Sequence, residues 1–286
     1  MSQPAMMTHS RETLERQERP DKLTLIAVSS LAYVLAVALH EHVGHALACS
    51  LLGGHPKEMG AFYVDCDYGA MRGLSVRLVA LAGPLVSLLT GAAGFRLLRS
   101  LPLTCGARWY FTWLIGSLGL MSASGYLLFS GVSGVGDVGV TRDGVFYDLA
   151  PEWFWRIALT AAGAITYYLV IRTMRQTIDL HVGETNAIKR ARRITLISYL
   201  TGAIAYAAIG LLNPHGFEII AMSVLPSSLG GTCGLLVMWS GNRGNPVSAP
   251  QIVDQGLDFP RNWIWIGVAV ACTVIYAAIF GPTLWL

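Results

Sequence analysis

The chain alternates between long apolar blocks and short polar stretches. Seven blocks are long and carry few charged residues: 23–52, 78–98, 109–131, 153–171, 194–212, 217–239 and 264–286. An α-helix rises 1.5 Å per residue, so about 20 apolar residues cross the hydrocarbon core of a bilayer. The pattern therefore predicts an all-α polytopic membrane protein with about seven transmembrane helices.

The sixth block is the least regular of the seven. Glu218 lies near its start, and Pro226 is followed closely by a group of small residues, Ser227, Ser228, Gly230 and Gly231. Proline and glycine interrupt helices, and such breaks are tolerated at membrane depth where the freed backbone groups find other partners. We expect this helix to be broken.

Composition agrees with this architecture. Of the 286 residues, 53% are apolar and 13% are charged, and the mean hydropathy is +0.52. A soluble domain has about 25% charged residues, so a soluble domain of useful size is excluded. The net charge of +3 does not indicate nucleic-acid binding, and we expect the lipid bilayer as the partner of the surface. The five cysteines show no CxxC spacing, so we expect neither a disulfide framework nor a thiolate metal site.

The distribution of basic residues predicts the orientation. With the N-terminus in the cytoplasm, most of the 20 Lys and Arg residues fall in inner segments, and the outer segments hold Lys57, Arg72, Arg77, Arg142 and Arg156. Loops rich in Lys and Arg face the cytoplasm. We therefore expect an integral protein of the bacterial inner (plasma) membrane, with a cytoplasmic polar tail (residues 1–22), a core of three transmembrane helices and a possible β-hairpin (23–150), and accessory transmembrane helices (151–286).

This topology places several ionisable residues at one level near the outer face. The first block carries the sequence HEHVGH, in which three histidines and a glutamate occupy residues 40–45. The third block ends at Asp137, and His215 lies in the short loop after the fifth block. The water interface would explain a lone histidine at this depth. Three histidines and a glutamate within six residues instead favour a metal site, because ionisable residues within a span are costly.

The chemistry of these residues suits zinc. Neutral imidazoles bind Zn²⁺, and a glutamate beside a ligand can take the proton of a water that the ion activates. The familiar HExxH pattern places two histidines on one helical face, whereas His40 and His45 are separated by about 140° on a regular helix. They can meet if a π-bulge accommodates the extra residue, which Gly44 would ease. The pair His42 and His45, with His40 or Glu41 nearby, is an alternative that the spacing leaves open.

Further motifs extend the pattern along the chain. HEHVGHALA, followed by the Gly-rich turn at residues 52–54, resembles the first-helix signature HExxHA of the site-2 protease family of intramembrane zinc metallopeptidases. The sequence at residues 82–85, AGPL, resembles the AGP element of that family, and residues 55–73 have the length of its β-hairpin. The third block ends in an Asp, as the family core does. The resemblance covers roughly residues 30–140.

This resemblance implies a membrane-embedded zinc metalloprotease-like protein that hydrolyses a peptide bond in or near the membrane. His40, His45 and Asp137 would hold the Zn²⁺ ion, Glu41 would be the catalytic residue, and the substrate would be a membrane protein or a peptide. The chain differs from the family in the extra residue of the first motif, in GVGDV where the family has a Leu-Asp-Gly run, and in Ser87 where the family has Asn.

Other functions stay open at this point. The sequence at residues 134–137 also matches the GxGD string of intramembrane aspartyl proteases, whose second acid would have to come from Asp65, Asp67 or Asp148 outside the spans. Membrane di-iron hydroxylases need more histidines than the seven present. His215 is a second candidate for the third metal ligand. A non-enzymatic transporter or scaffold, with a metal or proton site and Glu218 as a proton carrier in the broken sixth helix, is the alternative from another class.

Overall fold

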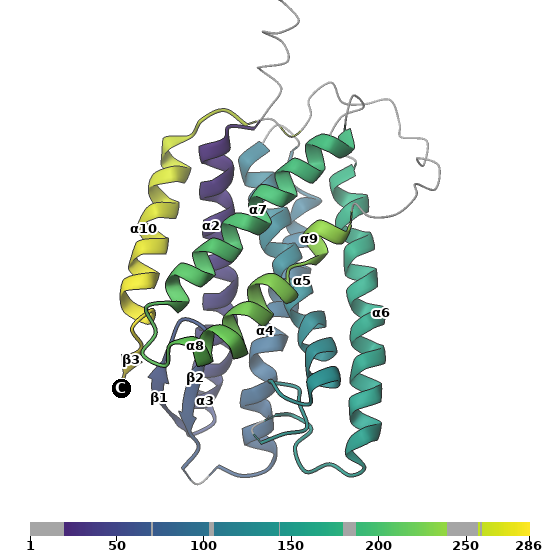
Figure 1. Cartoon of the computed structure of the whole chain (residues 1–286), viewed down its shortest axis with the longest axis vertical. Helices are drawn as coiled ribbons and strands as arrows, with labels where there is room; N and C mark the ends of the chain where they lie inside the picture. The colour runs from purple at the N-terminus through teal and green to yellow at the C-terminus, as the bar shows by residue number, and fades with distance from the viewer. Residues whose placement is uncertain are drawn as a thin grey trace, which may run out of the picture.

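The long helices form one bundle, and those that are consecutive in the chain run in opposite directions (Figure 1). The computed structural model describes residues 20–69, 71–102, 106–142, 144–179, 187–238, 257 and 259–286. Within these ranges, seven helices are long and apolar enough to cross a membrane, so the prediction of seven such helices is confirmed. Of the expected polar tail, residues 1–19 lie outside the described part of the chain.

The first long helix is built from three segments, and the sixth from four. The first consists of α2 (Lys22–Ala38), the π-helical η1 (Leu39–Ala46) and α3 (Leu47–Leu51). It is followed by α4 (Leu74–Leu98), α5 (Gly106–Ser133), α6 (Glu152–Asp179) and α7 (Ala187–Gly210). The sixth consists of α8 (Phe217–Ile219), the π-helical η2 (Ile220–Val224) and η3 (Pro226–Gly230), and α9 (Gly234–Val237), and the seventh is α10 (Trp263–Phe280).

The bundle has a dense interior and an apolar exterior. Helix α5 packs against α4, α6 and α2, and its Trp109, Tyr110 and Trp113 are buried. The outward side chains are also apolar, and Ile264 and Ile275 on α10 are 78% and 57% exposed. Contiguous apolar surface of this kind is unfavourable in water, whereas lipid chains solvate it well.

A small sheet lies at the end of the bundle away from the start of α2 (Figure 1). Strands β1 (His55–Met59) and β2 (Val64–Asp67) form the antiparallel hairpin that was expected after the first span. A third strand, β3 (Leu284–Trp285), pairs with the other edge of β1 and gives the order β2-β1-β3. The expectation of a seventh span that continues to residue 286 is therefore wrong, because α10 ends at Phe280 and the chain then turns into the sheet.

The sixth helix is broken, as its proline and glycines predicted. Its turn at residues 231–233 is held by tyrosine side chains from two other helices. The hydroxyl of Tyr167 donates to the Gly231 carbonyl at 2.8 Å and accepts from the Gly234 amide at 3.0 Å. Tyr33 donates to the Thr232 hydroxyl at 3.0 Å. The backbone groups freed by the break thus find partners inside the protein.

A disulfide joins Cys49 at the end of the first long helix to Cys66 in β2. The expectation that the cysteines form no disulfide is wrong in this respect. The hairpin folds back over α3, and this return brings together two cysteines that are 17 residues apart. The sulfur atoms are buried between the helix and the sheet, so the cross-link fixes the hairpin against the helix that carries the HEHVGH sequence.

Removal of this cross-link should destabilise the protein. We expect the double variant Cys49→Ala/Cys66→Ala to lose about 3 kcal/mol of unfolding free energy, because a cross-link over a loop of this length restricts the unfolded chain. Thermal unfolding in detergent measures the difference, with Cys272→Ala as control because Cys272 is a free cysteine. Equal stability of the double variant and the control would contradict the prediction.

Candidate metal centre

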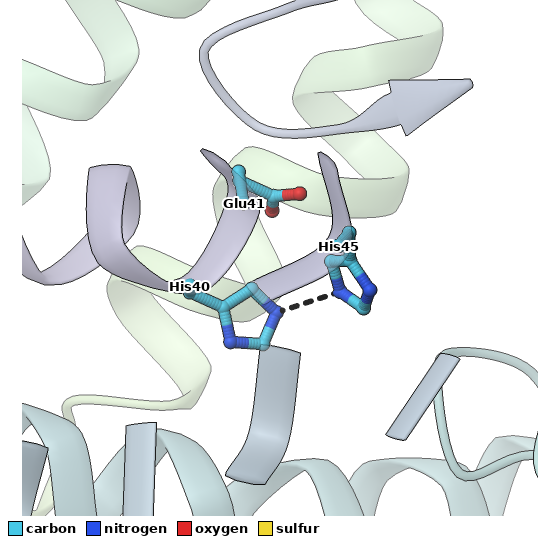
Figure 2. Close-up of side chains that lie close together, drawn as sticks. All are labelled: His40, Glu41 and His45. Atoms are coloured by element: carbon cyan, nitrogen blue, oxygen red, sulfur yellow. Dashed lines mark hydrogen bonds between the residues drawn. The ribbon is translucent and has the colours of Figure 1, made fainter. Parts of the chain in front are cut away.

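The π-helical segment η1 brings two histidines of the first long helix together. In a π-helix the hydrogen bonds run from i to i+5, so residues five apart lie on nearly the same face. The Nε2 atoms of His40 and His45 are 3.3 Å apart, and Figure 2 shows both rings on one side of the helix. The π-bulge that the HExxxH spacing required is therefore present, over Leu39–Ala46.

A glycine-rich loop after α5 adds a carboxylate to this pair. Gly134 and Gly136 adopt positive φ angles of 84° and 94°, a conformation that glycine accepts without steric cost. These turns direct Asp137 back toward the first helix, where its Oδ2 atom lies 3.1 Å from His40 Nε2 and 3.3 Å from His45 Nε2. Burial alone would raise the pKa of Asp137, but the charged form of His45 and hydrogen bonds with both imidazoles hold it below its ordinary value. Asp137 is thus an anion.

The three atoms have the spacing of ligands around one zinc ion. With bonds of about 2.0–2.1 Å and tetrahedral angles, two zinc ligands are about 3.3 Å apart. The triangle formed by His40 Nε2, His45 Nε2 and Asp137 Oδ2 has edges of 3.1, 3.3 and 3.3 Å. A cation at its centre would replace the hydrogen bonds among these three groups with bonds to the two nitrogens and the oxygen.

Helix α4 fixes the orientation of both imidazoles. His45 Nδ1 lies 2.8 Å from the Val79 carbonyl oxygen, so this nitrogen carries the proton and donates it. His40 Nδ1 lies 2.9 Å from the hydroxyl of Ser87. Such partners hold metal-binding histidines in one tautomer and leave Nε2 free to coordinate. Ser87, which appeared in the sequence as a departure from the family pattern, is here a direct partner of His40.

The helices η1 and α4 cross at two glycines. A Cβ atom at Gly44 would lie 2.6 Å from the Cα atom of Gly83, so neither helix tolerates a side chain at the crossing. A Cβ atom at Gly83 would also overlap His45 Nε2 and lie 2.8 Å from His40 Nε2. The glycine of the AGP sequence therefore leaves the space that the two rings occupy.

Glu41 follows the first histidine and completes the cluster. The potential ligand atoms of His40, Glu41 and His45 lie within 4.8 Å of one another, and Figure 2 shows the Glu41 carboxylate above the two rings. Glu41 is 5% exposed and has no hydrogen bond or ion pair to any residue in the described ranges. A buried carboxylate without a partner is unfavourable, so this group is free to act on water or on a bound molecule.

A cavity of about 640 Å³ opens beside these residues. Its walls come from the first three long helices, from the loop at Phe62 and Tyr63, and from the broken sixth helix at Pro226 and Gly231. Glu41 and Asp137 supply its carboxylates, and no Lys or Arg lines it within the described ranges. The accessory half of the chain thus forms part of the wall of the site, which the sequence did not indicate.

The alternative ligands lie elsewhere. His42 stacks on Phe280 at 4.0 Å between ring centroids, and its ring nitrogens have no hydrogen-bond partner within the described ranges. His215 lies beside the sheet, with its Nε2 atom 3.4 Å from Glu58 Oε2. The Asp137 carboxylate faces two histidines, and Asp67 Oδ2 lies 3.4 Å from Lys57 Nζ. These two aspartates therefore do not form the acid pair of an aspartyl protease.

The chain matches no known protein family, no curated protein and no solved structure. The resemblance to site-2 proteases therefore depends on the sequence motifs alone.

Replacement of Ser87 should weaken metal binding without removing a ligand. We expect Ser87→Ala to lower zinc affinity by about 10- to 100-fold, because the His40 ring loses the partner that orients it. Competition with a chromophoric chelator measures the affinity. Ser122→Ala is the matched control, since Ser122 lines the same cavity and is not among the hydrogen-bond partners of either histidine. Equal affinities for the two variants would argue against the role of Ser87.

Proposed function

We propose that this protein is a membrane-embedded zinc metallopeptidase, a diverged relative of the site-2 proteases, which hydrolyses a peptide bond in or near the membrane. The observation that carries the proposal is the triangle of His40, His45 and Asp137, with the unpaired carboxylate of Glu41 beside it. The triangle has zinc spacing, and the adjacent carboxylate is what hydrolysis requires. A structural metal site would not need such a residue.

The chain's residues support the steps of hydrolysis. A bound zinc ion supplies a Lewis acid that polarises the scissile carbonyl and lowers the pKa of water. Glu41 accepts the proton of the attacking water as its oxygen bonds to the carbonyl carbon. Glu41 then delivers that proton to the amide nitrogen as the carbon–nitrogen bond breaks, and the second proton of the water passes to the amine, so that the products are a carboxylate and an ammonium group. His40, His45 and Asp137 keep their positions throughout because α4 and the glycine loop hold them.

The cavity and the sheet suit an extended peptide. Val64 and Tyr68 of the β2 region line the cavity, and β2 is an edge strand of the sheet. Strand β1 is paired on both sides, so an added substrate strand in this cavity would pair with β2. The peptide would have to unwind to reach the centre, since its amide must become accessible to water.

The orientation expected from the basic residues places this end of the bundle outside the cytoplasm. The disulfide between Cys49 and Cys66 lies at the same end, and disulfides persist in oxidising compartments such as the bacterial periplasm. We therefore propose that the protein lies in the inner membrane of a bacterium, with the metal centre near the outer leaflet and the N-terminus in the cytoplasm.

Metal content tests the proposal directly. We expect about one zinc ion per chain in detergent-purified wild type, loss of zinc in His45→Ala, and retention of zinc in Glu41→Gln, because His45 is a ligand and Glu41 acts on water. Elemental analysis in metal-replete preparations without chelators gives the result. Glu41→Gln should also stop cleavage of peptides that the wild type hydrolyses.

Each departure from this pattern has a meaning. Wild type without bound metal would overturn the peptidase proposal and favour a transporter or scaffold. Zinc in the wild type with unchanged cleavage in Glu41→Gln would leave a metal site but remove the assigned catalytic role. Loss of zinc in both variants would make Glu41 a ligand.

A further inference from the structure

The tyrosines inside the bundle are almost all engaged through their hydroxyls. Tyr33 donates to the Thr232 hydroxyl at 3.0 Å, and Tyr167 donates to the Gly231 carbonyl at 2.8 Å. Tyr206 donates to the Tyr33 carbonyl at 2.8 Å. Tyr110 shares a 2.6 Å hydrogen bond with Ser198, and Tyr276 donates to the Ala61 carbonyl at 2.8 Å. Buried tyrosine hydroxyls usually find such partners. A tyrosine that departs from this pattern needs an explanation.

Tyr126 on α5 is that exception. Its hydroxyl makes no hydrogen bond to any residue in the described ranges, although the side chain lines the same cavity as Glu41 and Asp137. Its ring stacks on the His40 ring with 4.7 Å between centroids and an interplanar angle of 11°. The phenol is therefore fixed against a residue of the metal centre, and its hydroxyl is left without a protein partner.

Peptide hydrolysis needs a hydrogen-bond donor beside the carbonyl oxygen of the scissile bond. Negative charge develops on the carbonyl oxygen as water adds, and a positioned hydroxyl that donates to this oxygen contributes strongly to the rate. No Lys or Arg lines the cavity within the described ranges. Tyr167 and Tyr206 also line the cavity, but the hydroxyls of both already donate to backbone carbonyls.

We propose that the Tyr126 hydroxyl donates a hydrogen bond to the carbonyl oxygen of the scissile peptide bond. This assignment rests on the proposed peptidase function. Tyr126 keeps its proton throughout, and the proton that moves from water to the leaving amine passes through Glu41 alone. Stacking on His40 sets the position of the phenol, so that the donor and the metal centre act on the same carbonyl group.

The variant Tyr126→Phe isolates this role because it keeps the stacked ring and removes only the hydroxyl. We expect kcat for a peptide that the wild type cleaves to fall by about 100-fold with little change in KM. The affinity of a phosphonamidate peptide, whose oxygen mimics the developing charge, should fall by a similar factor in calorimetry. Zinc content and thermal stability should match the wild type. Tyr168→Phe is the control, since Tyr168 is 63% exposed on the outside of α6.

The outcomes separate this inference from the proposed function. Unchanged kcat and unchanged phosphonamidate affinity in zinc-loaded Tyr126→Phe would overturn the role of Tyr126 and leave the peptidase proposal intact. Loss of zinc in Tyr126→Phe would also overturn it, because the residue would then hold the centre together. A zinc-free, inactive wild type would instead remove the proposed function and this inference with it.

Discussion

The structure of the centre depends on one departure from α-helical geometry. A regular helix would turn His40 and His45 away from each other, and the π-helical segment at residues 39–46 returns them to one face. Helix α4 crosses this segment so closely, with Gly44 against Gly83, that neither position has room for a side chain. The same crossing brings the Ser87 hydroxyl to Nδ1 of His40 and the Val79 carbonyl to Nδ1 of His45. A single local distortion therefore sets the ligand spacing, the tautomers and the helix contact.

Electrostatics give the second constraint. Two histidines and two carboxylates lie together at the edge of an apolar bundle, where uncompensated charge is unfavourable. Asp137 has both imidazoles as neighbours, but Glu41 has no such partner in the described ranges. A divalent cation at the centre of the triangle would offset this accumulation of negative charge and lone pairs. If an ion binds there, its binding free energy would add to the stability of the folded state.

The sequence predicted those parts that depend on local pattern. The seven long helices follow from runs of apolar residues, the broken sixth helix from Pro226 and its glycines, and the bulge from the five-residue spacing of His40 and His45. The positions of the spans placed Asp137 at the same level as the histidines, and the resemblance to the family core implied its role as the third ligand. Its contact with both rings then depended on two glycine turns that its own GVGD sequence contains.

What the sequence could not predict depends on long-range packing. No sequence spacing predicts the pairing of Cys49 with Cys66, because it depends on where the hairpin folds. The contact of Ser87 with His40 likewise depends on where α4 packs. The third strand has only two residues, and its apolar sequence resembles the end of a span. The contribution of the sixth helix to the cavity wall depends on the tertiary arrangement of the whole bundle.

The third strand also connects the metal centre to the surrounding lipid. Helix α10 has most of its surface exposed and is followed directly by β3, which pairs with β1, while β1 pairs with the strand that lines the cavity. Helices tilt to match the thickness of the bilayer around them. A change in the tilt of α10 would therefore pull on the sheet and alter the width of the cavity entrance. Through this connection, the thickness of the membrane would become one of the variables that set the rate of the proposed peptidase.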